Sequence, residues 1–135
     1  MYALALLLIA SSLQPDADIA DANRQEIYQS FLSCAAFHTI EASKMDGTAV
    51  DAQKALAVDH AEAAAVYASD GKAETTNVDL QRTLDDFKGK LETGDPRDMA
   101  EQWTGLESAC AELYSIKDRL VRERKSAGSD EPEEK

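Results

Sequence analysis

The most regular apolar pattern of the chain lies in residues 96–125, which read PRDMAEQWTGLESACAELYSIKDRLVRERK. Large side chains recur there at steps of three and four residues, which places them on one face of an α-helix. Asp95 and Pro96 are a preferred N-cap and first-turn pair, and basic side chains gather in the last turns, where they complement the helix dipole. We predict one long helix from Pro96 to about Lys125. Its apolar seam consists of Met99, Trp103, Leu106, Cys110, Leu113 and Leu120, with Ile116 beside it.

Two more helices are predicted in the first half of the chain. Residues 23–44 repeat apolar side chains at alternating steps of four and three residues until Asp46 and Gly47 end the pattern. This stripe is wide enough to suggest burial against two neighbours. Residues 50–68 are rich in alanine, the best helix former, and Gly71 suits the left-handed position that follows a helix. The first stripe carries Ile27, Phe31, Cys34, His38 and Ala42.

The remaining helix is predicted to begin near Thr76 or Asn77, which suit an N-cap, and to end at Gly94. Four helices joined by short turns favour an all-α fold, a four-helix bundle with antiparallel up-down-up-down topology. Because only 6% of the residues are aromatic, the core must come from close helix approaches. We expect a single bundle domain at residues 23–125. The apolar face of its third helix consists of Leu80, Leu84, Phe87 and Leu91.

The two cysteines, Cys34 and Cys110, lie on the core-facing stripes of the first and last helices, which are neighbours in such a bundle. Together with an export signal, exactly two cysteines predict a disulfide, whose closed loop would contribute about 4 kcal/mol in the chain-entropy model. The alternative is a pair of buried thiols that act as small apolar side chains. Redox catalysis is disfavoured because there is no Cys-x-x-Cys motif.

The N-terminal residues resemble a secretory leader. Residues 3–10, ALALLLIA, have the length of a signal-peptide apolar region and are too short to cross a bilayer. Ala20, Asp21 and Ala22 form a small-x-small cleavage pattern, so residues 1–22 are predicted to be a signal peptide and the protein to be periplasmic or secreted, without stable membrane insertion after cleavage. Without cleavage, the run could instead act as a short membrane tether. At the other end, residues 126–135, SAGSDEPEEK, are predicted to be a disordered acidic tail.

The formal net charge of −12 restricts the classes of partner. Nucleic acids and anionic membrane surfaces would be repelled, whereas a basic protein would be attracted. Acidity also serves solubility alone in many proteins. Trp103 could anchor a partner, although its place on the seam favours the core. An exposed apolar stripe on the last helix would also suit a homodimer.

Histidines and carboxylates offer few candidates for catalysis or metal binding. There is no Cys-x-x-Cys-His haem motif and no Glu-x-x-His spacing of the di-iron bundles. His38 with Glu41 forms one grouping for a ligand or metal site, and His60 lies beside Asp59. An axial offset of about 9 Å between the histidines argues against a shared ion. We expect no metal and no cofactor, a hydrogen-bonded His38 at the core edge, and an exposed His60.

No catalytic constellation stands out, so the protein is predicted not to be an enzyme. The leading hypothesis is a protein-interaction module in the periplasm that engages a basic partner. One alternative is an immunity or inhibitor protein against a basic secreted toxin or hydrolase, which rests on analogy with that class of protein. The others are a stress chaperone or binder of apolar ligands, and a carrier of a metal or small ligand that uses His38.

Overall fold

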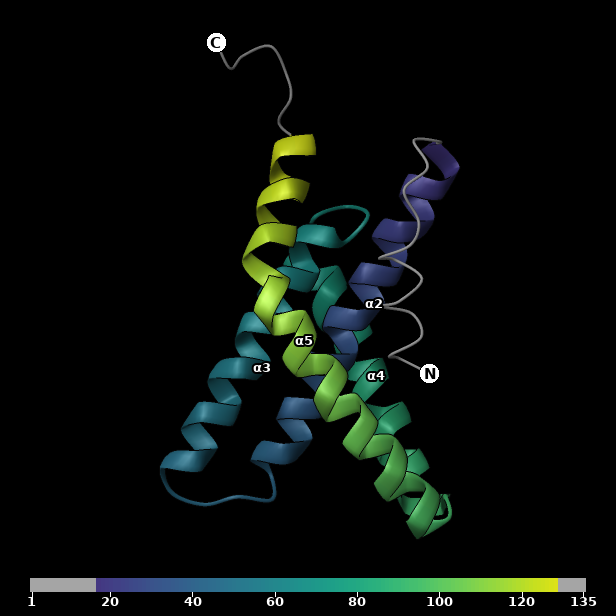
Figure 1. Ribbon diagram of the computed structural model, residues 1–135, viewed down its shortest axis with the longest axis vertical. Coiled ribbons are helices and arrows are strands. Elements are labelled where there is room, and N and C mark those ends of the chain that lie inside the picture. Colours follow the sequence, from purple (N-terminus) through teal and green to yellow (C-terminus); the bar gives the residue numbers. More distant parts are fainter. Residues whose placement is uncertain (1–16, 129–135) are drawn as a thin grey trace.

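The computed structural model describes residues 17–128, with side chains from residue 21 to residue 127. These residues form four helices, and no strand occurs among them. Successive helices run in opposite directions, which confirms the predicted antiparallel bundle (Figure 1). The helices are α2 (Ala17–Ala42), α3 (Thr48–Tyr67), α4 (Ala73–Thr93) and α5 (Pro96–Gly128). No helix of the described part of the chain has the length and apolar character needed to span a membrane.

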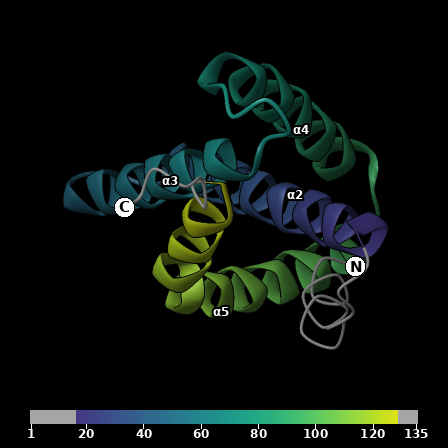
Figure 2. The ribbon, with the colours of Figure 1, turned by 90° about the horizontal axis from the view of Figure 1, so that it is seen from above.

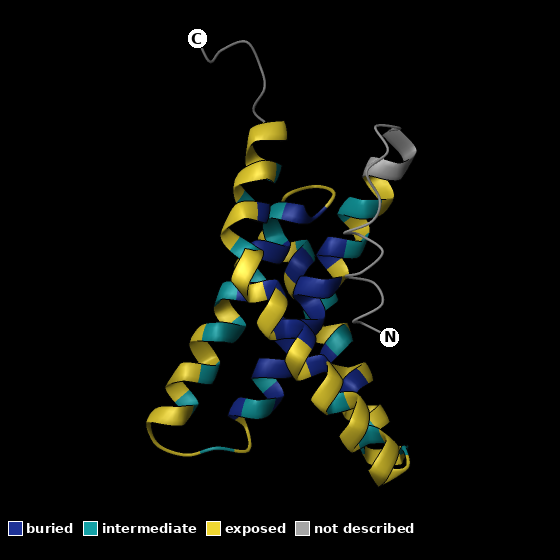
Figure 3. Ribbon diagram, in the orientation of Figure 1, coloured by how far each residue is buried: buried dark blue, intermediate teal, exposed yellow. Residues whose placement is uncertain are grey.

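Helix α2 is the centre of the bundle. It contacts all three other helices, and its middle turns are buried on almost every side (Figure 3). The wide apolar stripe therefore serves three neighbours, one more than the sequence suggested. Small side chains between the large ones allow this close approach, since Ala35 and Ala36 have no exposed surface. The largest fully buried side chains are Phe31, Leu32, Leu113, His60, Thr76 and Cys110.

Helices α4 and α5 lie on opposite sides of the pair formed by α2 and α3 (Figure 2). They are joined by a short turn at Gly94 and Asp95, and beyond it they make little contact with each other. A four-helix bundle usually packs its last two helices along their length. Here the two diverge, so part of their apolar faces is left without a helix opposite it.

The disulfide between Cys34 and Cys110 is present, which confirms the predicted link between the first and last helices. Its Cα atoms are 5.5 Å apart, and both residues are buried. The sequence has no other cysteine, so no free thiol remains. The bridge joins α5 to the central helix and is compatible with an oxidising, extracytoplasmic environment.

The predicted start of the third helix was wrong. Helix α4 begins at Ala73, and Thr76 is a buried residue inside it whose hydroxyl donates to the carbonyl of Lys72 at 3.2 Å. The reason is Asp70, whose carboxylate accepts hydrogen bonds from the Lys72 amide at 2.9 Å and from the Thr75 hydroxyl at 2.6 Å. These hydrogen bonds fix the turn that precedes Ala73. The helix therefore starts about one helical turn before Thr76 and Asn77, the residues that we expected to cap it.

Other helix ends follow the expected local chemistry in part. Gly71 has the predicted positive φ, +66°, but it does not follow the helix end directly. Helix α3 is capped by Ala68 in an extended conformation, and the Gly71 amide closes a turn onto the Ala68 carbonyl at 3.0 Å. The Asp95 carboxylate accepts a hydrogen bond from the Asp98 amide at 3.1 Å, as an N-cap does. Helix α2 begins at Ala17, before the expected cleavage position, and residues 126–128 of the expected tail belong to α5. The apolar run at residues 3–10 and the rest of the tail at residues 129–135 lie outside the described residues.

Two buried tyrosines connect distant parts of the bundle. The Tyr28 hydroxyl donates to the Asp79 carboxylate of α4 at 2.5 Å, and the Tyr67 hydroxyl donates to the Leu120 carbonyl of α5 at 2.7 Å. Burial raises the pKa of each phenol to about 12; the Asp79 carboxylate contributes at Tyr28 and the Glu123 charge at Tyr67.

These two phenols are expected to resist ionisation at alkaline pH. Because the folded-state pKa of each lies above its ordinary value of 10.0, stability falls as the pH rises above about 10. Ultraviolet titration of tyrosinate should show a late component that coincides with loss of helical circular dichroism. The double variant Tyr28→Phe and Tyr67→Phe should lose the part that coincides with unfolding and keep only a contribution from Tyr114, whose pKa is raised by its hydrogen bond to Asp59. Ionisation of all tyrosines near pH 10 with the helices intact would contradict this assignment.

Candidate functional site

A groove opens where α4 and α5 diverge over the N-terminal half of α2. It has a volume of about 710 Å³, within the usual range for ligand sites. We call it the α4–α5 groove. Its apolar surface comes from five residues of the two predicted seams on α4 and α5. The apolar lining residues are Phe87, Leu91, Met99, Trp103 and Leu106.

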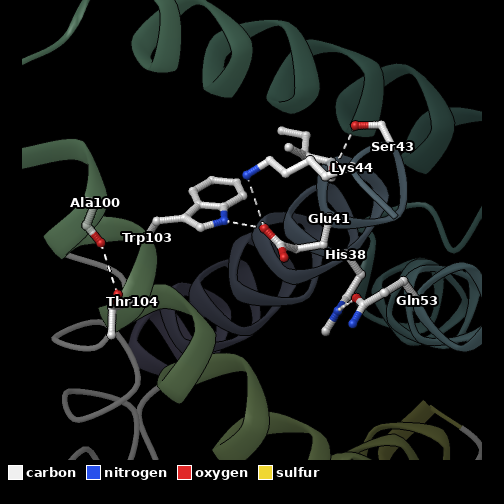
Figure 4. A network of polar contacts seen from close by, with 9 residues as sticks. His38, Glu41, Ser43, Lys44, Gln53, Ala100, Trp103 and Thr104 are labelled. Carbon is white, nitrogen blue, oxygen red and sulfur yellow. Dashed lines mark hydrogen bonds and ion pairs between the residues drawn. The ribbon is translucent and has the colours of Figure 1, made fainter. Parts of the chain in front are cut away.

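Trp103 forms one wall of this groove and is itself held firmly. Its ring packs against Phe37, with ring centroids 4.8 Å apart, and against the edge of Phe87 at 6.0 Å. Its indole nitrogen donates to the Glu41 carboxylate at 2.6 Å, and the Lys44 ammonium lies 3.3 Å from the same oxygen and 5.2 Å from the ring centroid (Figure 4). The side chain is partly buried, so it contributes to the core and also presents surface to the groove.

The polar residues around the groove are mostly acidic or uncharged. Glu26 of α2 and Glu101 of α5 contribute carboxylates, and three glutamines complete the border. The basic side chain that lines the groove, Lys90, forms an ion pair with Asp86 at 3.2 Å. The groove therefore has an apolar floor and a negative border.

A second, smaller cavity of about 370 Å³ lies between α2, α3 and α5. His38 is at its wall, buried, with Nδ1 2.7 Å from the Gln53 side-chain oxygen (Figure 4). Behind it lies His60, whose Nδ1 is 2.7 Å from the Leu56 carbonyl oxygen. The two imidazole centroids are 5.1 Å apart, so the rings meet despite the axial offset, because both side chains reach across the α2–α3 interface.

The expectation that His60 is exposed was wrong. The side chain has no exposed surface, because it lies against three aromatic rings: Phe31 at 6.1 Å, His38 at 5.1 Å and Tyr114 at 5.4 Å. Burial lowers the pKa of His60 to about 4, and the nearby charges of His38 and Lys117 add to this effect. The Leu56 carbonyl and the Asp59 carboxylate act in the opposite direction. The imidazole is therefore neutral at physiological pH.

Glu41, the expected companion of His38, is engaged elsewhere. Its carboxylate is bound by Trp103 and Lys44, as described above, although the residue also contributes to the wall of the smaller cavity. Across the described residues, no group of three or more histidine, cysteine, aspartate and glutamate side chains is arranged to hold a metal ion. The structure thus brings together the two histidines and leaves Glu41 at the cavity wall.

The α4–α5 groove was not predicted from the sequence. Its residues belong to helical stripes that were correctly recognised as apolar, and such stripes usually pack against one another. Nothing in their spacing indicates that α4 and α5 would be held apart on opposite sides of α2. One signal was available, since Gly105, which lines the groove, lies inside α5, where a helix gains nothing from glycine.

Comparisons of this chain with protein families, curated proteins and solved structures found no match.

Proposed function

We propose that this protein is an exported interaction module whose α4–α5 groove receives a basic, amphipathic helical segment of a partner protein. The supporting observation is the combination of an apolar floor with a carboxylate border in one groove. A helix that docks in a groove inserts apolar side chains from one face and leaves its charged face at the rim. Lysine or arginine side chains on that face would meet Glu26 and Glu101.

The charge of the whole chain favours the same class of partner. At a net charge of −12, the protein attracts cationic segments over several ångströms and repels acidic ones. The apolar run at residues 3–10 and the buried disulfide support placing this interaction in the periplasm or outside the cell. Trp103 would provide the aromatic anchor that such interfaces commonly use.

A synthetic helical peptide of leucine and lysine is expected to bind the full-length protein and shift the fluorescence of Trp103, the only tryptophan. A peptide of leucine and glutamate with the same spacing should not bind. Affinity should fall as salt is raised beyond about 0.15 M, because the rim charges are exposed to screening. Replacing Glu26 and Glu101 with glutamine should reduce both the affinity and its salt dependence.

Gly105 and Gly89 provide a matched pair of blocking and control variants. Both lie inside helices, and a Cβ added at either would meet no atom within 4 Å, but only Gly105 lines the groove. Gly105→Leu should place a side chain in the groove and weaken peptide binding, whereas Gly89→Leu should leave binding unchanged. Both should raise helix stability by a similar amount, about 1 kcal/mol. Equal binding of the two peptides, or undiminished binding to Gly105→Leu, would rule out the groove as the docking site.

A further inference from the structure

One buried polar atom of the bundle lacks a hydrogen-bond partner. Among the described residues, Nε2 of His60 is fully buried and has no donor or acceptor within reach. Its Nδ1 faces the Leu56 carbonyl oxygen, which can only accept, so the proton of the neutral ring is on Nδ1. Nε2 therefore holds a lone pair in the interior. A buried acceptor of this kind usually marks a site for a water molecule, an ion or a ligand.

His38 is prepared in the same way. Its Nδ1 lies 2.7 Å from the side-chain oxygen of Gln53; with the amide in this orientation, Nδ1 donates and Nε2 of the neutral ring holds the lone pair. Metal-binding histidines characteristically donate their second ring nitrogen to a carbonyl or carboxylate, which fixes the tautomer and the ring orientation. Both rings have such a partner, and each partner comes from α3, which packs closely on α2.

We propose that Nε2 of His38 and Nε2 of His60 bind one Cu²⁺ ion between α2 and α3. With a metal–nitrogen distance of about 2.0 Å, each ring centre lies about 3 Å from the ion. Two such rings have centres about 4 Å apart at a right angle and about 6 Å apart on a straight line. The observed separation of 5.1 Å falls between these limits.

The surroundings favour copper over other metals. Both cysteines are in the disulfide, so no thiolate is available to select zinc or Cu⁺. With two imidazole ligands, Cu²⁺ is the ion that the divalent affinity order places highest. The 5.1 Å separation corresponds to an angle of about 110° at the ion, so the two rings would shift slightly toward the right angle of a tetragonal copper site. The remaining positions would take water from the cavity at His38. The Glu107 carboxylate lines that cavity and attracts cations, whereas the charge of Glu41 is already paired with Lys44.

Charged groups near the two imidazole rings both favour and oppose the binding of a cation. The Asp59 carboxylate, which accepts a hydrogen bond from the Tyr114 hydroxyl at 3.0 Å, favours a cation beside His60. The Lys117 ammonium, 5.5 Å from the Tyr114 ring centroid, opposes it. This site is built by α2, α3 and α5 and shares neither histidine with the α4–α5 groove, so the proposal stands independently of the proposed function.

The test is a Cu²⁺ titration of the full-length, chelator-treated protein with its disulfide intact, in competition with a weak chelator. We expect one equivalent to bind with an electron paramagnetic resonance spectrum that shows coupling to two nitrogens. His38→Gln and His60→Phe should each weaken binding by at least about tenfold, as loss of a ligand or its support does. The phenyl ring of His60→Phe preserves the aromatic contacts of the buried site.

Two further measurements separate this site from adventitious copper on an acidic surface. Glu107→Gln removes a carboxylate of the cavity and leaves both imidazoles, so its spectrum should keep the two-nitrogen pattern. In the unsubstituted protein, a small fraction of an equivalent of Cu²⁺ should broaden the imidazole resonances of both histidines before other signals in long-range ¹H–¹⁵N spectra, which requires no variant to fold. An oxygen-only copper spectrum, equal affinity in all variants, or unbroadened imidazole resonances would overturn the proposal.

Discussion

Replacement of both Cys34 and Cys110 with alanine is expected to lower the free energy of unfolding by about 4 kcal/mol. The bridge closes a loop between residues 76 positions apart, so it removes much of the conformational freedom of the unfolded chain. Stabilities of single domains are about 5–15 kcal/mol, so this loss is a large part of the total. Urea unfolding followed by circular dichroism should show a clear fall in the midpoint.

The structure also predicts where the loss is felt first. Helix α5 makes little contact with α4; the bridge links it to the central helix, and near its end the Leu120 carbonyl accepts a hydrogen bond from Tyr67 of α3. Amide exchange in the double variant should therefore accelerate in α5 more than in α2. Reduced but unsubstituted protein is the control, because its thiols still fill the core. If reduction left both the midpoint and the exchange unchanged, the packing of α5 alone would hold the bundle together.

The helices themselves were largely predictable from local chemistry. Helix α5 follows from the three-and-four spacing between Met99 and Leu113, and its first residue from the Asp95–Pro96 pair. The disulfide was predictable because each of the two cysteines lies on the core-facing stripe of its own helix. The start of α4 was misplaced because Thr76 has a side chain typical of a cap, whereas the helix begins after Lys72 without a side-chain cap, and Asp70 stabilises the preceding turn.

The candidate site was much less predictable, because it depends on which helix faces pack against one another in the bundle. The spacing of Phe87 and Leu91 shows that they share a helix face, but the same spacing describes a packed seam and an open groove. His60 is flanked by Asp59 and Glu62, which made exposure the natural expectation. Its burial arises from the aromatic rings of Phe31 and Tyr114, which are distant in the sequence. The residues around His60 do not predict these contacts.

Acidification of the metal-free protein is expected to destabilise the fold through His60, by up to about 3 kcal/mol. The pKa of His60 is about 4 in the folded chain and about 6.5 when the chain is unfolded. Between these values the unfolded chain binds a proton that the folded chain does not, so stability decreases as the pH falls from about 7 to 4. Below pH 4 both states are protonated, and this contribution stops changing.

His60→Phe is the variant that isolates this contribution, because surface carboxylates titrate equally in both proteins. With a chelator present, urea unfolding should be measured from pH 7 to pH 4 for each. The difference between the two unfolding free energies should shift in favour of the variant as the pH falls. Phenylalanine also removes the unpaired buried nitrogen, so the variant should equal or exceed the wild type even at pH 7. Parallel pH profiles would mean that a proton or a hydrogen-bond donor reaches His60 in the folded protein. The copper site depends on a neutral imidazole whose Nε2 has no partner, so that proposal would then be wrong.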